Sequence, residues 1–367
     1  FKEQLMNLIY DYQIFTGQEY GGISRYFYEL INQSKGVIDV KVTGYFSNNY
    51  YLNRTRLKKR NFLKGITFKG KYRILDLINK QNSIQTLKTN NYDIFHPTYY
   101  NPYFLKYIKD KPLVITVHDM IHEKFSDFFS KNDKSIIWKK KIIHRANKII
   151  AISENTKSDI LHFYNIDPSK IEVIYHGNSI NLNNHSTTNN NLPENYLLFV
   201  GGRNGYKYFL PFIEAIIPII HKEKINIVCV GGGQFSNEEL SFFEKKKITE
   251  RIKQYNLSDD ELIIAYKKAL AFVYPSLYEG FGMPILEAFA CNCPLACSNT
   301  SCFPEIAGDG ASFFNPQSSE SIKFAIEKIL YDTTYRNNLI EKGKYIEKKF
   351  SWEKTFNQTM NLYKTVL

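Results

Sequence analysis

The sequence lacks a hydrophobic run long enough to cross a membrane. The nearest candidate, Phe209 to Ile220, contains Pro211, Glu214 and Pro218, and no run approaches the roughly 20 apolar residues that a spanning helix needs. The first residues also lack the pattern of a signal peptide. We therefore expect a cytoplasmic protein that associates with a membrane at most peripherally.

Cysteine is scarce and unpaired in its spacing. The chain has five cysteines, an odd number, which argues against a disulfide framework and for a reducing compartment: Cys229, Cys291, Cys293, Cys297 and Cys302. The last four are close together in the sequence, but no histidine lies near them. We interpret them as small buried residues and predict no zinc site.

Acidic residues are missing from one long stretch. Between Tyr50 and Leu75 there is no acid but nine cations: Arg54, Arg56, Lys58, Lys59, Arg60, Lys64, Lys69, Lys71 and Arg73. The whole chain has 48 basic and 36 acidic residues, a formal charge of +12. Nucleic acid, an anionic membrane or phosphorylated small molecules would each suit this charge. A coding bias toward Lys, Asn and Ile is the alternative explanation.

What is present is an alternation of short apolar strands and helical segments, repeated twice. The predicted strands of the first series are Asn7–Tyr10, Val40–Gly44, Ile94–His96, Leu113–Val117, Lys148–Ile152 and Ile171–Ile174. Those of the second are Tyr196–Val200, Ile225–Val230, Leu270–Tyr274, Pro294–Cys297 and Ala311–Phe314. Helices at Ser24–Gln33, Ile136–Ala146 and Asn155–Phe163 separate strands of the first series. The pattern predicts α/β architecture with two doubly wound, Rossmann-like domains.

Length and composition set the domain boundaries. A chain of 367 residues suits about two domains, and Gly177 to Pro193 is polar enough to link them. We predict an N-terminal domain at 6–180, a C-terminal domain at 193–350 and a final helical segment at 351–367. In such folds the ligand binds beyond the carboxyl ends of the strands, so we expect the two domains to face each other across a ligand cleft.

The strongest chemical motif runs from Glu279 to Ala288 and follows a predicted strand. Gly282, Met283 and Pro284 begin a helix there, and the free amides of a helix N-terminus bind phosphate. Glu279 precedes this helix and Glu287 lies one turn into it, so both carboxylates are placed to accept hydrogen bonds from sugar hydroxyls. A capping or surface role for the two acids is the structural alternative.

Three further glycine turns follow predicted strands. Phe199 to Lys207 holds Arg203 and Lys207, two cations suited to a diphosphate. Gly21 and Gly22 join the first strand to the first long helix. Glycine turns are common, so these signals are weaker than the first. Gly231 opens a third turn, Gly231-Gly232-Gly233.

Histidines end two predicted strands. His118 follows Val117, and His96 precedes Pro97. Functional side chains project from such positions, although many histidines there only satisfy local hydrogen bonds. We single out His118 as the functional candidate and place His96 on the acceptor side of the site.

Together these motifs resemble family 4 of the retaining glycosyltransferases, which have the GT-B fold, across nearly the whole chain. The resemblance implies that Glu287 binds the nucleotide ribose, that Glu279 contacts the donor sugar, and that Arg203 and Lys207 stabilise the leaving diphosphate. It further implies that His118 lies beside the donor sugar, that the loop at Gly21 and Gly22 closes over the phosphates, and that Gly231 lies near the nucleobase. The final helix of such proteins crosses back to the first domain.

The resemblance predicts transfer of a hexose from a GDP- or UDP-linked donor to a glycan or lipid-diphosphate-linked acceptor, with retention, as in bacterial surface-polysaccharide mannosyltransferases. We expect no cofactor and no metal, since the acidic segment from Ser258 to Glu261 has the spacing of a helix cap. Two alternatives remain open. One is a sugar-nucleotide epimerase on the same fold. The other is a nucleic-acid-binding protein, although we expect no nucleic-acid partner.

Overall fold

The computed structural model describes residues 5–66, 68–180, 182 and 191–367, which fold into two compact units. The first unit comprises the chain up to His176 together with Trp352–Leu367, and the second comprises Gly177–Ser351. Part of the predicted linker, residues 181 and 183–190, lies outside the described residues, as do residues 1–4 and 67.

The first unit is built on six parallel strands: β1 (Asn7–Tyr10), β2 (Asp39–Val42), β3 (Ile94–His96), β4 (Val114–Val117), β5 (Lys148–Ala151) and β6 (Ile171–Val173). Of these, β1, β3, β4 and β5 are largely buried. They form two ladders, β2-β1-β3 and β4-β5-β6. A single parallel bridge between Phe95 and Leu113 joins the ladders. All four residues of β4 are buried, as expected of a parallel strand between covered faces.

The helices of the first unit are α1 (Gln13–Gly17), α2 (Gly22–Gln33), α3 (Lys71–Lys88), α4 (Ile121–Lys124), α5 (Ser135–Arg145), α6 (Glu154–Phe163) and α14 (Trp352–Lys364). Three of them, α2, α3 and α6, begin after a glycine or a capping serine. Short 3₁₀ turns lie at Leu52–Arg54, Pro102–Lys106, Ser126–Phe128 and Pro168–Lys170. Ser153 caps α6 as predicted, since its side chain accepts from the amide of Thr156 at 3.0 Å.

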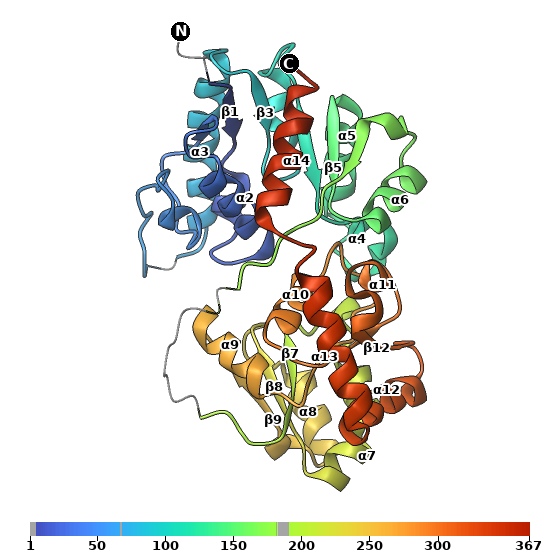
Figure 1. Cartoon of the computed structure of the whole chain (residues 1–367). Coiled ribbons are helices and arrows are strands. Elements are labelled where there is room, and N and C mark those ends of the chain that lie inside the picture. The colour runs from blue at the N-terminus through green and yellow to red at the C-terminus, as the bar shows by residue number, and fades with distance from the viewer. Residues whose placement is uncertain (1–4, 67, 181, 183–190) are drawn as a thin grey trace. The chain divides into compact units, whose positions relative to one another are not determined.

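The last helix belongs to the first unit although the second unit precedes it in the chain. α14 packs beside α2 in that unit (Figure 1). Its buried Tyr363 is hydrogen-bonded through its hydroxyl to His96 Nδ1 at 2.6 Å and to the Tyr10 hydroxyl at 3.2 Å. These bonds attach α14 to β1 and β3, so the predicted return of the final helix to the first domain is confirmed.

The second unit has one sheet of six parallel strands in the order β12-β11-β10-β7-β8-β9. The strands are β7 (Tyr196–Val200), β8 (Asn226–Val230), β9 (Ile252–Tyr255), β10 (Ala271–Tyr274), β11 (Leu295–Ser298) and β12 (Ala311–Phe314). Counted from β7, this is the doubly wound order 3-2-1-4-5-6 read from its other edge. The direction of winding reverses between β7 and β10, and ligands of such sheets bind at that point.

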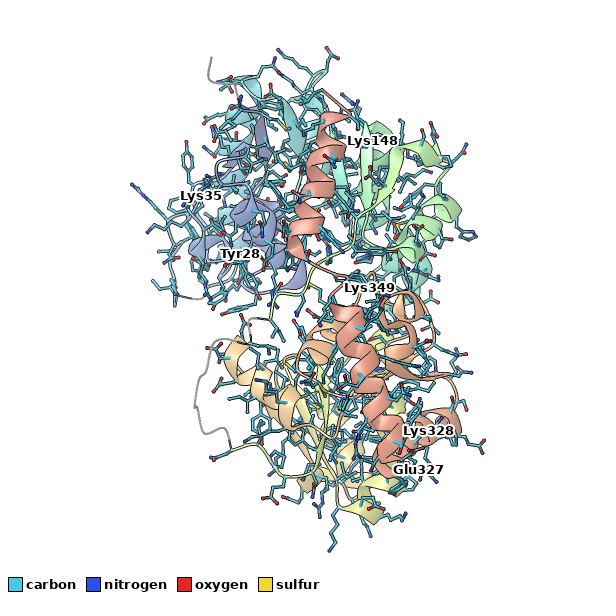
Figure 2. The ribbon with its side chains drawn as sticks, viewed as in Figure 1. Tyr28, Lys35, Lys148, Glu327, Lys328 and Lys349 are labelled. Atoms are coloured by element: carbon cyan, nitrogen blue, oxygen red, sulfur yellow. The ribbon has the colours of Figure 1, made fainter. Side chains whose placement is uncertain are left out.

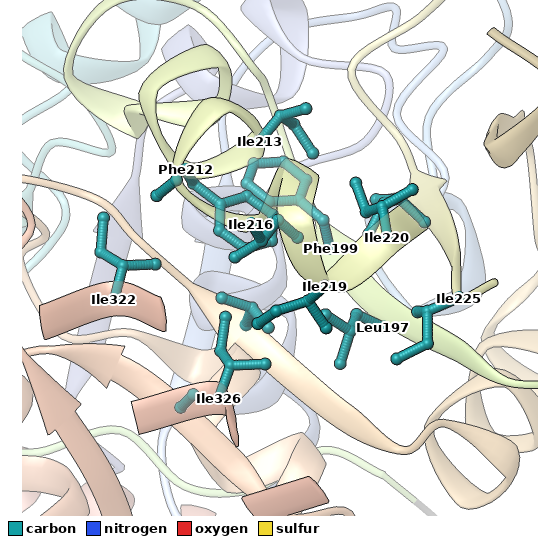
Figure 3. Packing of buried hydrophobic residues seen from close by; sticks show 14 of the residues in the cluster. Leu197, Phe199, Phe212, Ile213, Ile216, Ile219, Ile220, Ile225, Ile322 and Ile326 are labelled. Carbon is teal, nitrogen blue, oxygen red and sulfur yellow. The ribbon is translucent and has the colours of Figure 1, made fainter. Parts of the chain in front are cut away.

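The helices of the second unit pack an apolar stripe on this sheet. They are α7 (Phe209–Glu223), α8 (Asn237–Lys245), α9 (Asp259–Lys268), α10 (Met283–Ala290), α11 (Phe303–Ala307), α12 (Ser319–Tyr331) and α13 (Thr333–Glu347), with 3₁₀ turns at Gly205–Lys207, Thr249–Arg251 and Gly308–Gly310. In Figure 3, Phe212, Ile216 and Ile219 of α7 meet Leu197 of β7 and Ile326 of α12. Their spacing of three and four residues is that of one helix face.

The predicted fold class is confirmed: both units are parallel α/β sheets with helices between the strands. None of the described helices combines the length and hydropathy that a bilayer crossing would require. One strand was missed, β9, whose residues are Ile-Lys-Gln-Tyr. It lies at the edge of its sheet and pairs on one side only, so its polar side chains reach solvent and its sequence does not resemble a buried strand.

Candidate active site

The loops that follow β7 and β10 form the centre of the candidate site in the second unit. Both loops leave the sheet at its switch point, between β7 and β10, where the direction of winding reverses. The amide of Leu277, in the loop after β10, donates to the carbonyl of Tyr206, in the loop after β7, at 2.8 Å. This bond ties the two loops that carry the predicted motifs.

Lys207 and Glu279 meet at this point. Lys207 Nζ lies 2.6 Å from Glu279 Oε1, and the hydroxyl of Ser276 donates to the same oxygen at 2.7 Å. The two side chains of the ion pair keep 20% and 14% of their surface exposed. The pair is therefore preorganised and remains within reach of a ligand.

The backbone of Glu279 is fixed by a neighbouring turn. The hydroxyl of Ser301 donates to the Glu279 carbonyl at 2.6 Å and accepts from the Glu279 amide at 3.2 Å. The hydroxyl of Thr300 donates to the Leu277 carbonyl at 3.0 Å. The loop thus holds its carboxylate in one place before any ligand arrives.

The motif that is predicted to bind phosphate has the geometry of a helix start. Gly282 precedes α10 with φ of +87°, and Pro284 lies in the first turn. A Cβ at Gly282 would come within 3.1 Å of Ile285 Cδ1, so both the conformation and the space favour glycine. The first amides of α10, beginning at Met283, form the positive end of the helix dipole.

Glu287 lies one turn into α10 and is 7% exposed. Its Oε2 accepts from the hydroxyl of Tyr266 on α9 at 3.1 Å. Burial, together with the neighbouring Glu287, raises the pKa of Tyr266 well above its usual value, so this phenol stays a donor. A fixed, nearly buried carboxylate suits recognition of ligand hydroxyls.

Arg203 has other partners than Lys207 among the described residues. Its Nε donates to Glu239 Oε1 at 2.6 Å, and its other nitrogens donate to backbone carbonyls of the glycine turn after β8. Its side chain is only 4% exposed. That Arg203 contacts a diphosphate stays a prediction.

His118 lies at the end of a strand of the first unit and has a buried polar atom that makes no hydrogen bond among the described residues. The strand is β4, and the atom is Nε2. Burial, then the nearby His96 and Lys139, lower the pKa of His118 to about 3, so the ring is neutral at pH 7. A neutral imidazole with one unused nitrogen is suited to bind a ligand hydroxyl.

Gly21 and Gly22 lie at the start of α2, which packs on His118. Gly21 is the residue before the helix, and its carbonyl accepts from the Arg25 amide at 3.0 Å. From the same helix, Tyr26 packs edge-on against His118 with 5.4 Å between ring centroids. The glycine loop is therefore coupled to His118 through one helix.

The acceptor-side role predicted for His96 is wrong. Its ring is fully buried, with Nδ1 bonded to the Tyr363 hydroxyl at 2.6 Å and Nε2 to the Thr116 hydroxyl at 3.0 Å. Both nitrogens are used and no surface remains for a ligand. His96 is a structural link between β3, β4 and α14.

The acidic segment at Ser258 forms a helix cap, as predicted. Ser258 and Glu261 exchange side-chain and backbone hydrogen bonds at the start of α9. Among the described residues no three His, Cys, Asp or Glu side chains are grouped as metal ligands would be. The five cysteines are free and buried.

Sequence reasoning missed the residues that hold the functional ones: Ser276, Tyr266, Ser301 and Glu239. Only Glu239 left a signal, because Ser236 and Glu239 have the Ser-x-x-Glu spacing of a capping box and form one in the structure. Tyr266 and Ser301 are distant in sequence from the carboxylates they serve, and no local pattern marks them.

Two family models divide the chain between them. Residues 20–181 match the model described as Glycosyltransferase Family 4, and residues 182–345 match the model described as Glycosyl transferases group 1. O-antigen chain mannosyltransferase B of Escherichia coli is 25% identical, over 94% of this chain and 96% of its own length. O-antigen chain mannosyltransferase RfbU of Salmonella typhimurium is 32% identical, over 59% and 60%.

Solved structures are similar over the whole chain. A sucrose-phosphate synthase from Thermosynechococcus elongatus matches with a TM-score of 0.78 at 17% identity, covering 98% of this chain and 99% of its own. Anabaena HepE, solved with UDP and glucose, matches with a TM-score of 0.76 at 17% identity, covering 98% and 100%. At this identity the likeness establishes the fold.

Proposed function

The chain belongs to family 4 of the glycosyltransferases, and from this premise we propose that it transfers a hexose from a GDP- or UDP-linked donor. The acceptor is a glycan or a lipid-diphosphate-linked saccharide. The bond from the sugar C1 to the diphosphate oxygen breaks, and an acceptor oxygen bonds to C1 on the same face. The acceptor proton leaves with the nucleoside diphosphate. We further propose that the reaction needs no metal ion.

The observation that supports this proposal best is the preorganised cluster at the switch point of the second unit. The cation of Lys207 and the first amides of α10 lie on the loops that follow β7 and β10. Charges fixed in this way stabilise a departing diphosphate without reorganising during the reaction. In this scheme Glu279 contacts the donor sugar, Glu287 holds the ribose and His118 positions the reacting sugar.

The names of the relatives support a proposal for the transferred sugar and for the class of pathway. The two curated proteins named above are O-antigen chain mannosyltransferases, so we propose a mannosyl-type hexose and a role in bacterial surface-polysaccharide synthesis. We expect no cofactor.

Thermal unfolding with GDP, UDP or dTDP, in the presence of a chelator, tests the proposal. A ligand at 100 times its dissociation constant adds about 2.7 kcal/mol of stability. We expect one diphosphate to raise the melting temperature of the wild type and to lose most of that effect in Glu287→Ala. Absence of stabilisation by all three, or dependence on added Mg²⁺, would contradict the proposal.

The acid-free stretch supports a second proposal, peripheral binding to an anionic membrane. Most of its cations are exposed, but Lys59 and Lys71 donate to backbone carbonyls of their own unit. Exposed apolar side chains accompany the cations: Leu63, Ile66, Phe68, Tyr72, Ile74 and Leu77. Cations beside exposed apolar groups are the combination that anionic lipid surfaces attract.

Exposed lysines also occur outside this stretch, on both units, as Lys35 and Lys328 illustrate (Figure 2). The total charge is therefore not collected in one dense face of the kind that nucleic-acid binding favours. Sedimentation with phosphatidylglycerol vesicles tests the membrane proposal. We expect Lys64→Glu with Lys69→Glu to weaken binding at least ten-fold, and Lys35→Glu with Lys328→Glu to act as the charge-matched control. Equal binding by both double variants would overturn it.

A further inference from the structure

Two lysines in the described part of the first unit are buried, and they differ in what compensates their charge. Lys139 is fully buried, and its Nζ lies 2.9 Å from Glu123 Oε2. Lys71 is 8% exposed, and its Nζ donates to the carbonyls of Leu63 and Ile66, both at 2.8 Å. It forms no ion pair with any residue that the structure describes. A buried charge normally has a counter-charge, so Lys71 departs from the rule that Lys139 follows.

The position of Lys71 in its helix adds to this cost. Lys71 is the first residue of α3, directly after Gly70. The N-terminus of a helix carries a partial positive charge, which favours anions and disfavours a cation. The sequence between Tyr50 and Leu75 contains no acid. Burial, the helix end and the neighbouring sequence therefore all oppose the charge, and such departures are expected at functional sites.

Lys71 lines a hollow of about 410 Å³ in the first unit. The other lining residues come from the loop before α2 and from the segment before α3: Glu19, Asn48, Lys64, Gly65, Phe68 and Tyr72. Lys64 is exposed and brings a second cation to the hollow. The ammonium of Lys71 has three N–H donors, and its two carbonyl partners use two of them. Two cations with donors to spare suit a phosphate group.

The hollow also offers groups for what is attached to a phosphate. Glu19 is a carboxylate of its lining, and the Tyr72 hydroxyl lies 3.5 Å from Glu19 Oε1. Both groups are able to exchange hydrogen bonds with sugar hydroxyls. Exposed apolar side chains belong to the same segment, namely Leu63, Ile66 and Phe68. A phosphate that carries a sugar at one end and a lipid at the other therefore finds a matching group for each part.

Backbone hydrogen bonds fix the hollow to the glycine loop that precedes α2. The buried Asn49 donates through Nδ2 to the Gln18 carbonyl at 2.8 Å, and the Tyr50 amide donates to the Glu19 carbonyl at 2.9 Å. Helix α2 follows this loop and packs on His118. The hollow is thus built onto the loop and helix of the first unit that already carry candidate functional residues.

We propose that this hollow binds a phosphate group esterified to a lipid, and that its occupant is the diphosphate of the lipid-linked acceptor. Lys71 and Lys64 bind the phosphate oxygens, and Glu19 accepts from a hydroxyl of the attached sugar. The inference rests on the proposed function, because it takes a lipid-diphosphate-linked saccharide as the acceptor. The headgroup of an anionic phospholipid has related chemistry, so the test separates the two sources.

Calorimetric titration of the full chain with mannosyl octyl diphosphate, a soluble lipid-linked saccharide, tests the proposal. GDP or UDP is present at saturation, so that the nucleotide site is not available to the probe. Lys64→Met and Lys58→Met each remove one exposed lysine of the acid-free stretch, but of the two only Lys64 lines the hollow. We expect affinity to fall about five-fold or more in Lys64→Met and about ten-fold or more in Lys71→Met, since each removes a charged donor. Lys58→Met should stay within two-fold of the wild type, and Lys64→Met carries the test if Lys71→Met does not fold.

Three further ligands identify the bound group. Octyl mannoside, which lacks the diphosphate, should bind about ten-fold more weakly or worse, because the cations lose their partner. Dihexanoyl phosphatidylglycerol should also bind more weakly, and equal affinity would assign the hollow to membrane headgroups and overturn the acceptor assignment. Glu19→Ala should reduce the preference for mannosyl octyl diphosphate over octyl diphosphate, and an unchanged preference would refute the sugar contact.

Kinetics and nucleotide binding separate this inference from the proposed function. In transfer assays Lys64→Met should raise the KM for the lipid-linked acceptor while the KM for the donor changes little. A wild type that binds neither GDP nor UDP would overturn the proposed function and this inference together. If the wild type binds one of them, but Lys64→Met and Lys58→Met have equal affinity for mannosyl octyl diphosphate, this inference alone is overturned.

Discussion

At the scale of single residues, two cation–carboxylate pairs beside the loop after β7 have the same length but different surroundings. Lys207–Glu279 and Arg203–Glu239 are both 2.6 Å contacts. The first pair is partly exposed at the switch point of the sheet, whereas the second is enclosed by carbonyls and an aromatic ring. The lysine charge is therefore partly open to solvent, whereas the arginine charge is almost enclosed.

This contrast makes a prediction for Lys207. Lys207→Ala removes a partly exposed charged donor of the cluster, and loss of one preorganised donor typically costs 10²–10³ in rate. We expect kcat/KM for transfer to fall by about that factor, measured by release of the nucleoside diphosphate. Lys222→Ala, which breaks an exposed ion pair of the same unit, should change kcat/KM less than two-fold. A Lys207→Ala enzyme within five-fold of the wild type would contradict the role.

How far the sequence predicts the site differs from residue to residue. Glu279, Gly282 and Glu287 share one loop–helix segment, so their mutual placement follows from local geometry. Arg203 and Lys207 are four residues apart, yet the partner of Arg203 is 36 residues away, and no local spacing announces it. His96 and His118 occupy the same kind of strand end, and only long-range contacts distinguish a satisfied ring from one with an unused nitrogen.

At the scale of elements, the close approach of α13 to α10 depends on missing side chains. A Cβ at Gly343 of α13 would lie 2.6 Å from Phe289 Cδ1 of α10, and one at Gly310 would lie 2.8 Å from Phe289 Cζ. The ring of Phe289 therefore fills the space that two glycines leave. This packing supports the helix that carries Glu287.

Gly343→Ala should consequently destabilise the second unit despite the better helix propensity of alanine. Overpacking of this kind costs about 1–3 kcal/mol, against a propensity gain of about 1 kcal/mol. We expect a lower urea midpoint, followed by circular dichroism. Gly17→Ala in α1, where a Cβ meets nothing within 4 Å, is the matched control and should be neutral or slightly stabilising. A Gly343→Ala midpoint at or above that of the wild type would show that α13 can move aside.

Strands and helices were predictable from the sequence where their burial requires apolar residues. Buried parallel strands such as β7 and β10 are continuous apolar runs, so their positions follow from the sequence. β9 and α3 were not predicted. β9 is an edge strand with polar side chains, and α3 lies partly within the basic stretch, with few apolar residues facing the core. Their positions are fixed by neighbours, which a local pattern does not contain.

At the scale of the whole molecule, the two units differ in their buried histidines and tryptophans. His96, His118 and His176 are buried in the first unit, whereas His221, the described histidine of the second, is exposed. Both tryptophans, at 138 and 352, also belong to the first unit. Trp352 stacks on His176 with 5.5 Å between ring centroids. Tryptophan fluorescence therefore reports on the unit that contains the buried imidazoles.

Mild acid should destabilise the first unit selectively. Burial lowers the pKa of His96 and of His118 to about 3, and it lowers the pKa of His176 as well. Between roughly pH 6.5 and 3 the unfolded chain binds protons that the folded unit excludes, so stability is full above about pH 6.5 and falls as the pH drops. At pH 5 each histidine should cost up to about 2 kcal/mol, at about 1.4 kcal/mol per pH unit.

Urea unfolding followed by tryptophan fluorescence at pH 7.5 and pH 5.0 measures this loss. His118→Leu is the informative variant, because it removes one of the three imidazoles together with a buried nitrogen that has no partner in the described chain. The stability of His118→Leu should depend on pH by about a third less than that of the wild type. At pH 7.5 the variant should be at least as stable as the wild type, because an unsatisfied buried polar group costs about 1–3 kcal/mol. The same variant should lose transfer activity while retaining diphosphate binding, because the residues proposed to bind the nucleotide belong to the other unit. A pH dependence equal to that of the wild type would mean that His118 takes up its proton in the folded state, and its proposed role as a neutral contact to the reacting sugar would fail with it.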